Sequence, residues 1–154
     1  MALTLYEELT KEAHEHGYTV TEVPLEHSDG IVYGKLVGVR TGQTEVEKTC
    51  VLAEEMAHAQ YTVGNILDLS DTANRKQERF ARIKSYDRLI GLSGIVQAFK
   101  HGCRNQYEMA DFLDVTEKFL REALECYKDK YGLGTTYGDY IIQFEPCLSV
   151  SMKI

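Results

Sequence analysis

Residues 50–59 are the part of the sequence that most restricts how the chain can fold. They are almost all apolar, and their only strongly polar side chains are Glu54, Glu55 and His58. Just upstream, Thr44 and Glu47 have the spacing of a capping box, which predicts a helix from residue 45 to about residue 62. Because a helix with so little polar surface must be packed deeply, we expect this segment to be largely buried.

These polar residues have the spacing of a metal-binding helix. Glu54 and His58 are four residues apart, so they share one helix face and can hold one ion. Glu55 lies about 100° further round the helix, within reach of a water molecule on that ion. This is the geometry of the H-E-x-x-H zinc helix with Glu54 in place of the first histidine, and a carboxylate is an accepted zinc ligand. We therefore predict Glu54 and His58 as metal ligands and Glu55 as the general base.

A catalytic zinc ion commonly has three protein ligands and one water, so a third ligand is needed. Glu78 is the best candidate because it follows His58 on the next predicted helix. Ala81 and Ser85, at i+3 and i+7 from Glu78, are small enough to let the two helices approach. Asp68 is an alternative ligand, in a loop whose direction the sequence does not fix. A separate apolar stripe is expected to anchor this helix in the core: Phe80, Ile83 and Ile90.

The polar residues of these two predicted helices also fit simpler interpretations. The polar residues of the first helix share one arc, as on a solvated face: Glu47, Glu54, Glu55, His58 and Thr62. The basic residues around Glu78 fit either a solvated face or a groove that attracts an acidic substrate: Arg75, Lys76, Arg79, Arg82 and Lys84. Tyr61, one turn after His58, could reach the metal site and donate to an oxyanion.

The order of the remaining elements predicts an α+β fold. Short strands come first, helices occupy the middle, and strands return at the end. The expected helices span residues 3–16, 45–62, 74–92, 93–101, 106–113 and 116–131. The expected strands span residues 18–24, 31–40, 140–145 and 147–153, the last two forming a hairpin around Pro146.

Composition narrows the classes of function. The chain has 154 residues and a formal net charge of −7, which disfavours general binding to nucleic acid, because phosphates are bound by an excess of Lys and Arg. The N-terminal segment is acidic and amphipathic, unlike a signal peptide, and we find no apolar run long enough to span a membrane. Four widely spaced cysteines indicate neither a zinc ribbon nor a disulfide scaffold. We therefore expect a cytoplasmic protein.

Residues 106–125 have the pattern of a helix-turn-helix. Ala110, Val115 and Leu120 fall where such a unit needs one small and two core residues, and Thr116 is a good N-cap for the second helix. However, residues 94–132 contain six Lys and Arg against seven Asp and Glu, which disfavours DNA binding. A helical scaffold or a partner-docking surface is the preferred interpretation, and a DNA-binding regulator is the alternative.

The sequence resembles the ImmA/IrrE family of metallopeptidase-like proteins, many of them encoded on phages and mobile elements. The resemblance rests on GKLVGVRTGQTEVEKTCVLAEEMAH and RKQERFARIKSYDRLI, and covers residues 30–92. It departs from the family pattern at Glu54, where histidine is usual, and at Lys84 and Ser85, where Phe-Ala is common. Carried over by position, the family roles fall on Glu54 (first ligand), Glu55 (base), Ala57 (the usual glycine), His58 (second ligand) and Glu78 (third ligand).

The resemblance implies a zinc-dependent endopeptidase that cleaves a transcriptional repressor guarding a mobile element. An oxygen-rich ligand set would also accept manganese. The implied architecture is a zincin-like, mainly helical core in residues 1–92 with a small N-terminal β-sheet. Residues 93–154 would add helix-turn-helix-like helices and a C-terminal β-hairpin, packed as one unit with the core. An alternative function is that of a catalytically impaired member acting as a protein-interaction module.

Overall fold

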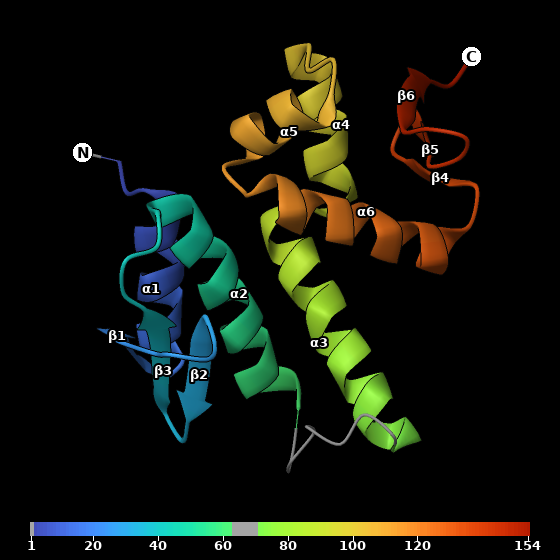
Figure 1. Cartoon of the computed structure of the whole chain (residues 1–154). Coiled ribbons are helices and arrows are strands. Elements are labelled where there is room, and N and C mark those ends of the chain that lie inside the picture. Colours follow the sequence, from blue (N-terminus) through green and yellow to red (C-terminus); the bar gives the residue numbers. More distant parts are fainter. Residues whose placement is uncertain (1, 63–70) are drawn as a thin grey trace. The chain divides into compact units, whose positions relative to one another are not determined.

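The computed structural model describes residues 2–62 and 71–154. The chain divides into two compact units, Met1–Ser85 and Tyr86–Ile154. Each unit combines helices with a three-stranded sheet, so the fold is α+β as predicted (Figure 1). Among the described residues, no helix is both long enough and apolar enough to cross a membrane.

The sheet of the first unit contains β1 (Thr19–Val23), β2 (Gly30–Tyr33) and β3 (Leu36–Arg40) in the order β1-β3-β2. Strand β3 is parallel to β1 and antiparallel to β2. The prediction of one continuous strand over residues 31–40 is therefore wrong. Gly34 has a positive φ of 59° and begins a two-residue turn that reverses the chain, a conformation that glycine adopts at little steric cost.

Two helices cover one face of this sheet. Helices α1 (Leu5–Glu15) and α2 (Glu45–Tyr61) contact each other, and both pack on strands (Figure 1). Alternate residues of β3 point into the core between them, where Val37 and Val39 are fully buried. Each helix begins with a capping box: Thr44 with Glu47, as predicted, and Thr4 with Glu7, which was not predicted.

Helix α3 (Thr72–Leu89) begins in the first unit and ends in the second. In the first unit its buried residues are Ala81 and Ser85, the two small side chains that the sequence singles out. Phe80, in contrast, is 49% exposed, so the prediction that it anchors the helix in the core is wrong.

The helices of the second unit are α4 (Gly91–His101), α5 (Gln106–Leu113) and α6 (Glu117–Tyr131). Their core contains Ile95, Leu120 and Tyr127, all fully buried. The Tyr127 hydroxyl donates to Asp87 Oδ1 at 2.9 Å and accepts from the Gly91 N–H at 3.2 Å. This residue therefore ties α6 to the beginning of the unit.

The second unit ends in an antiparallel sheet of β4 (Gly134–Tyr137), β5 (Tyr140–Gln143) and β6 (Ser149–Met152). The predicted C-terminal hairpin corresponds to β5 and β6, whereas β4 was not predicted. Its first residue, Gly134, belongs to a Gly-Leu-Gly run directly after α6, and glycine commonly terminates helices. A side chain at Gly134 would approach the Ile142 carbonyl oxygen at 2.7 Å, so glycine also permits the close pairing of β4 with β5.

Candidate metal site on helices α2 and α3

Helix α2 carries three of the predicted site residues at the boundary of the core. Its buried residues include Leu52, Ala53 and Met56. Glu54, Glu55 and His58 are half-buried, which distinguishes this arc from a fully solvated helix face. The nearly apolar helix is deeply packed, as predicted from the sequence, and it holds these polar side chains at the edge of the core.

Glu55 packs against the first residue of strand β2. A Cβ atom at Gly30 would lie 2.7 Å from Glu55 Cγ and 2.6 Å from Val51 Cγ1, both closer than atoms can approach. The absence of a side chain at Gly30 therefore makes room for Glu55 beside the strand. Sequence reasoning missed this role, because the contact depends on how the sheet packs against α2.

His58 and Glu78 meet across α2 and α3. The Nε2 atom of His58 lies 2.8 Å from Oε2 of Glu78, which is hydrogen-bond distance. The other oxygen of Glu78, Oε1, accepts from Nε of Arg82 at 2.8 Å. The His58 and Glu78 side chains are 29% and 17% exposed, so the pair is shielded but still accessible to solvent. We call these three residues the His58–Glu78–Arg82 chain.

A second carboxylate approaches the other side of the imidazole ring. Oε2 of Glu55 is 4.0 Å from Nδ1 of His58, which is too long for a well-formed hydrogen bond but close enough for charge attraction. Glu55, and Glu78 with it, raise the pKa of His58 above its ordinary value, whereas partial burial lowers it. In this structure the ring is therefore held between two carboxylates that favour its charged form.

The structure brings together part of the predicted ligand set. His58, Glu78 and Glu55 are neighbours, whereas Glu54 is half-buried one residue before Glu55 on α2. Across residues 2–62 and 71–154, no three His, Cys, Asp or Glu side chains are grouped as ligands of one ion. Asp68, the alternative ligand, lies outside the described residues. The observed constellation is thus a histidine with one carboxylate on each ring nitrogen.

Tyr61 is engaged beside this constellation. Its ring meets that of Phe80 edge to face, with centroids 5.6 Å apart. The Nζ of Lys84 lies 5.1 Å from the Phe80 centroid and 5.6 Å from the Tyr61 centroid. These contacts explain why Phe80 stays near the surface: it pairs with an aromatic residue of α2 and a cation of its own helix.

The second unit contains the other segment that the sequence singled out. Helix α5 ends at Asp114, which has a left-handed conformation with φ 60°, and α6 follows after the N-cap Thr116. As predicted, the three structural positions of the segment are buried: Ala110, Val115 and Leu120. The Thr116 side chain accepts from the Phe119 N–H at 3.0 Å, the expected capping bond.

Comparison with known proteins gives no assignment for either unit. No model of a known protein family matches the sequence, and no curated protein matches it significantly. The geometry around His58 is therefore the basis of the function that we propose.

Proposed function

We propose that the first unit is a metal-dependent endopeptidase of the kind the ImmA/IrrE resemblance implies, with Glu55 as its general base. Glu54, His58 and Glu78 would hold the ion as its first, second and third ligands. The observation that carries this proposal is the 2.8 Å approach of His58 Nε2 to Glu78 Oε2. This contact joins two helices. His58 is the histidine of the H-E-x-x-H-like pattern, and Glu78 is the glutamate predicted on the helix after it.

The donor set suits zinc. Imidazole nitrogen and carboxylate oxygen are both common zinc ligands, and Arg82 holds Glu78 through the oxygen that faces away from His58. Glu54 precedes His58 by one helical turn and can supply a further carboxylate. When bound, zinc would make a water molecule more acidic and polarise a carbonyl group. Two anionic ligands would weaken both effects, so we expect a slow enzyme.

The residues around the site could position a peptide substrate. Glu55 is half-buried and would accept a proton from water and pass it to the leaving amine. Gly30, which contacts it, begins β2, and β2 lies at an edge of its sheet. An unpaired strand edge can hydrogen-bond an extended peptide, which would bring a scissile bond close to Glu55. Following the resemblance, we propose a transcriptional repressor as the substrate.

Metal analysis tests this proposal directly. Protein purified without chelator should carry zinc or manganese, or bind zinc at micromolar concentration in calorimetry. His58→Ala and Glu78→Gln should abolish binding, whereas His14→Ala, at an exposed histidine of α1, should not change it. Absence of uptake by the wild-type chain would eliminate the enzyme.

Activity then separates the base from the ligands. With a library of unstructured peptides as substrate, Glu55→Gln should lose hydrolysis while retaining metal and fold. The matched substitution Glu8→Gln, at an exposed position of α1, should keep the wild-type rate. Equal rates for wild type and Glu55→Gln would show that Glu55 is not the base.

A non-catalytic interaction protein is the second candidate. The observation in its favour is that the His58–Glu78–Arg82 chain satisfies its own hydrogen bonds, as a structural link between α2 and α3 would. On this alternative, Glu55→Gln should leave partner binding unchanged, and no metal should bind.

For the second unit we propose a helix-turn-helix-like scaffold that docks a protein partner. The short turn at Asp114 and the buried core positions support this geometry. The slight acidic excess of residues 94–132 favours protein over DNA. If the segment instead binds duplex DNA, affinity should fall steeply with salt and weaken when Lys118 and Arg121 are replaced by Ala.

A further inference from the structure

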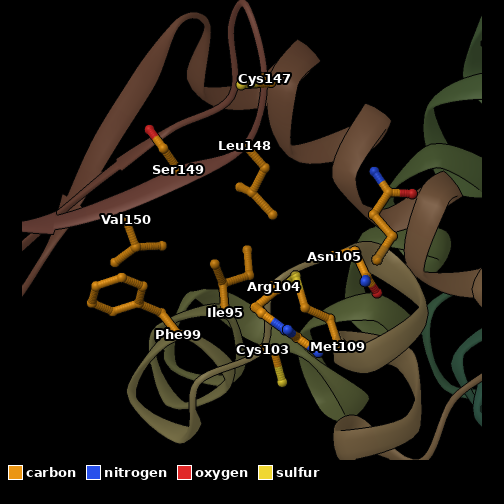
Figure 2. A pocket seen from close by; sticks show the side chains of 11 residues that line it. Ile95, Phe99, Cys103, Arg104, Asn105, Met109, Cys147, Leu148, Ser149 and Val150 are labelled. Atoms are coloured by element: carbon orange, nitrogen blue, oxygen red, sulfur yellow. The ribbon is translucent and has the colours of Figure 1, made fainter.

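The second unit contains a cavity that plays no part in the proposed function. Its volume is about 350 Å³, and it lies between α4, the beginning of α5 and the segment that leads into β6. Figure 2 shows Leu148 and Val150 on one side, facing Ile95 and Phe99 on the other. Met109 supplies a further apolar wall. The cavity therefore has apolar walls and a polar rim, with a volume at the lower end of the range for small-molecule sites.

Four polar residues at its rim form hydrogen bonds within the protein. The guanidinium of Arg104 binds the Glu108 carboxylate, with NH2 3.0 Å from Oε2. Asn105 accepts from the Glu108 N–H at 2.8 Å, and the Cys103 thiol lies 3.5 Å from the Glu108 carbonyl oxygen. Ser149 donates to Gln143 at 3.2 Å. One residue, Glu108, thus engages three of the rim's polar groups.

These bonds determine what the cavity can recognise. The Arg104 charge is offset by Glu108, so an anion entering the cavity would gain little. Limited burial, together with Glu108 and Asp111, raises the pKa of the Cys103 thiol, which stays uncharged at neutral pH. A charged group placed between the apolar walls would lose hydration. The apolar walls therefore favour an uncharged group.

We propose that this cavity binds an uncharged, apolar small molecule of one or two aromatic rings. The ligand would lie between Leu148 and Val150 on the sheet side and Ile95 and Phe99 on α4. Three sulfur atoms, those of Cys103, Met109 and Cys147, would border it and provide polarisable contacts to an aromatic ring.

A pair of fluorescent dyes tests the ligand class. N-phenyl-1-naphthylamine is neutral, and 8-anilinonaphthalene-1-sulfonate adds one anionic group to nearly the same skeleton. In titrations of the full-length chain, the neutral dye should bind about tenfold more tightly or better. Equal or tighter binding of the sulfonate would overturn the uncharged class, and no binding of the neutral dye up to its solubility limit would overturn the site.

Two matched variants test the location. Leu148→Trp should fill the cavity and weaken the neutral dye by about tenfold or more. Ile141→Trp adds the same side chain at an exposed position of β5 that does not line the cavity, and should leave binding unchanged. Circular dichroism verifies that both variants are folded. Unaltered binding by a folded Leu148→Trp would place the dye elsewhere and overturn the proposal.

The cavity thiols give a measurement that needs no substitution. With the neutral dye at about ten times its Kd, alkylation of Cys103 and Cys147 by N-ethylmaleimide should slow by about tenfold. Cys126, on α6 and outside the lining, should react at its original rate. Mass spectrometry of the digested protein follows each site. Equal slowing at all three thiols, or at none, would overturn binding in the cavity.

Discussion

Two long-range side-chain pairs, one in each unit, show how differently a polar contact can be used. His58 and Glu78 meet at the edge of the first unit with partly exposed side chains. Tyr127 and Asp87, 40 residues apart in sequence, meet in the second unit, where Tyr127 is fully buried. Both pairs have short contacts, so distance alone does not distinguish them. The difference lies in the two rings: His58 is half-buried between two carboxylates, whereas Tyr127 is fully buried and only its partner Asp87 is exposed.

The pKa shifts of Tyr127 and His58 also differ in their causes. Burial, and then the Asp87 carboxylate, raise the pKa of Tyr127 far above that of an ordinary tyrosine, so its hydroxyl stays protonated at neutral pH. The pKa of His58 is also raised, by Glu55 and Glu78, but this ring has solvent and two carboxylates around it. The Tyr127 hydroxyl is thus a buried, protonated link within the second unit, whereas His58 is the half-buried side chain that we propose as a metal ligand.

The largest effect on stability is expected at Gly30, which packs against Glu55 beside the His58–Glu78 pair. In Gly30→Val the new side chain would overlap Val51 and Glu55, lowering the free energy of unfolding by about 3 kcal/mol. Urea unfolding followed by circular dichroism measures this loss. Ile31→Val, at the adjacent and exposed position, is the control and should change stability little. A stable Gly30→Val protein would show that Glu55 is not packed against the strand.

Zinc should stabilise the folded protein through the His58–Glu78 pair and not through the Tyr127–Asp87 pair. At zinc concentrations about 100 times Kd, ligand binding adds about 2.7 kcal/mol to the free energy of unfolding and raises the thermal midpoint. Glu78→Gln should lose this gain, whereas Tyr127→Phe should retain it, because Tyr127 is not a predicted ligand. Scanning calorimetry with and without zinc compares the three proteins. A gain that persists in Glu78→Gln would place the ion elsewhere.

Tyr127→Phe should weaken the second unit by about 2 kcal/mol, because it leaves the Gly91 N–H without its hydroxyl acceptor. The loss should depend on pH. An unfolded tyrosine ionises at pH about 10, while the folded one keeps its proton, so the wild type loses stability as pH rises above about 10. The phenylalanine variant lacks this contribution. Urea titrations of both proteins at pH 8 and 10.5 measure this contribution. An equal change in the free energy of unfolding between the two pH values would contradict the burial of the Tyr127 hydroxyl.

Local signals explain which parts of the structure could be predicted. The beginnings of α2 and α6 follow from the caps Thr44 and Thr116, because a cap acts within one turn. The capping box of Thr44 with Glu47 is likewise a local signal, because its two residues are three apart. Such features depend on neighbours within a few residues, which the sequence displays directly.

The features that were not predicted depend on distant contacts. The fit of Glu55 against Gly30 depends on how a strand packs on α2. Strand β4 exists because β5 offers it a partner, although its own sequence begins with a helix-ending glycine. Phe80 was placed in the core because its hydrophobicity suggests burial, whereas Tyr61 and Lys84 give it a place at the surface. The position of Glu54 likewise depends on side-chain directions that helical spacing does not fix.

The smallest effect on stability, and the finest test of the comparison, is expected at Arg82. Its side chain is 57% exposed, so Arg82→Gln should lower the free energy of unfolding by only about 0.3 kcal/mol, as for an ordinary i,i+4 pair. Because Arg82 holds Glu78 in position, the same change should weaken zinc binding by about tenfold. Arg104→Gln breaks an equivalent Arg–Glu i,i+4 pair in the second unit and should leave zinc affinity unchanged. Calorimetric zinc titrations of both variants test this difference. Equal affinities would mean that Arg82 is a surface residue without a role in zinc binding, and that Glu78 needs no second residue to bind the ion.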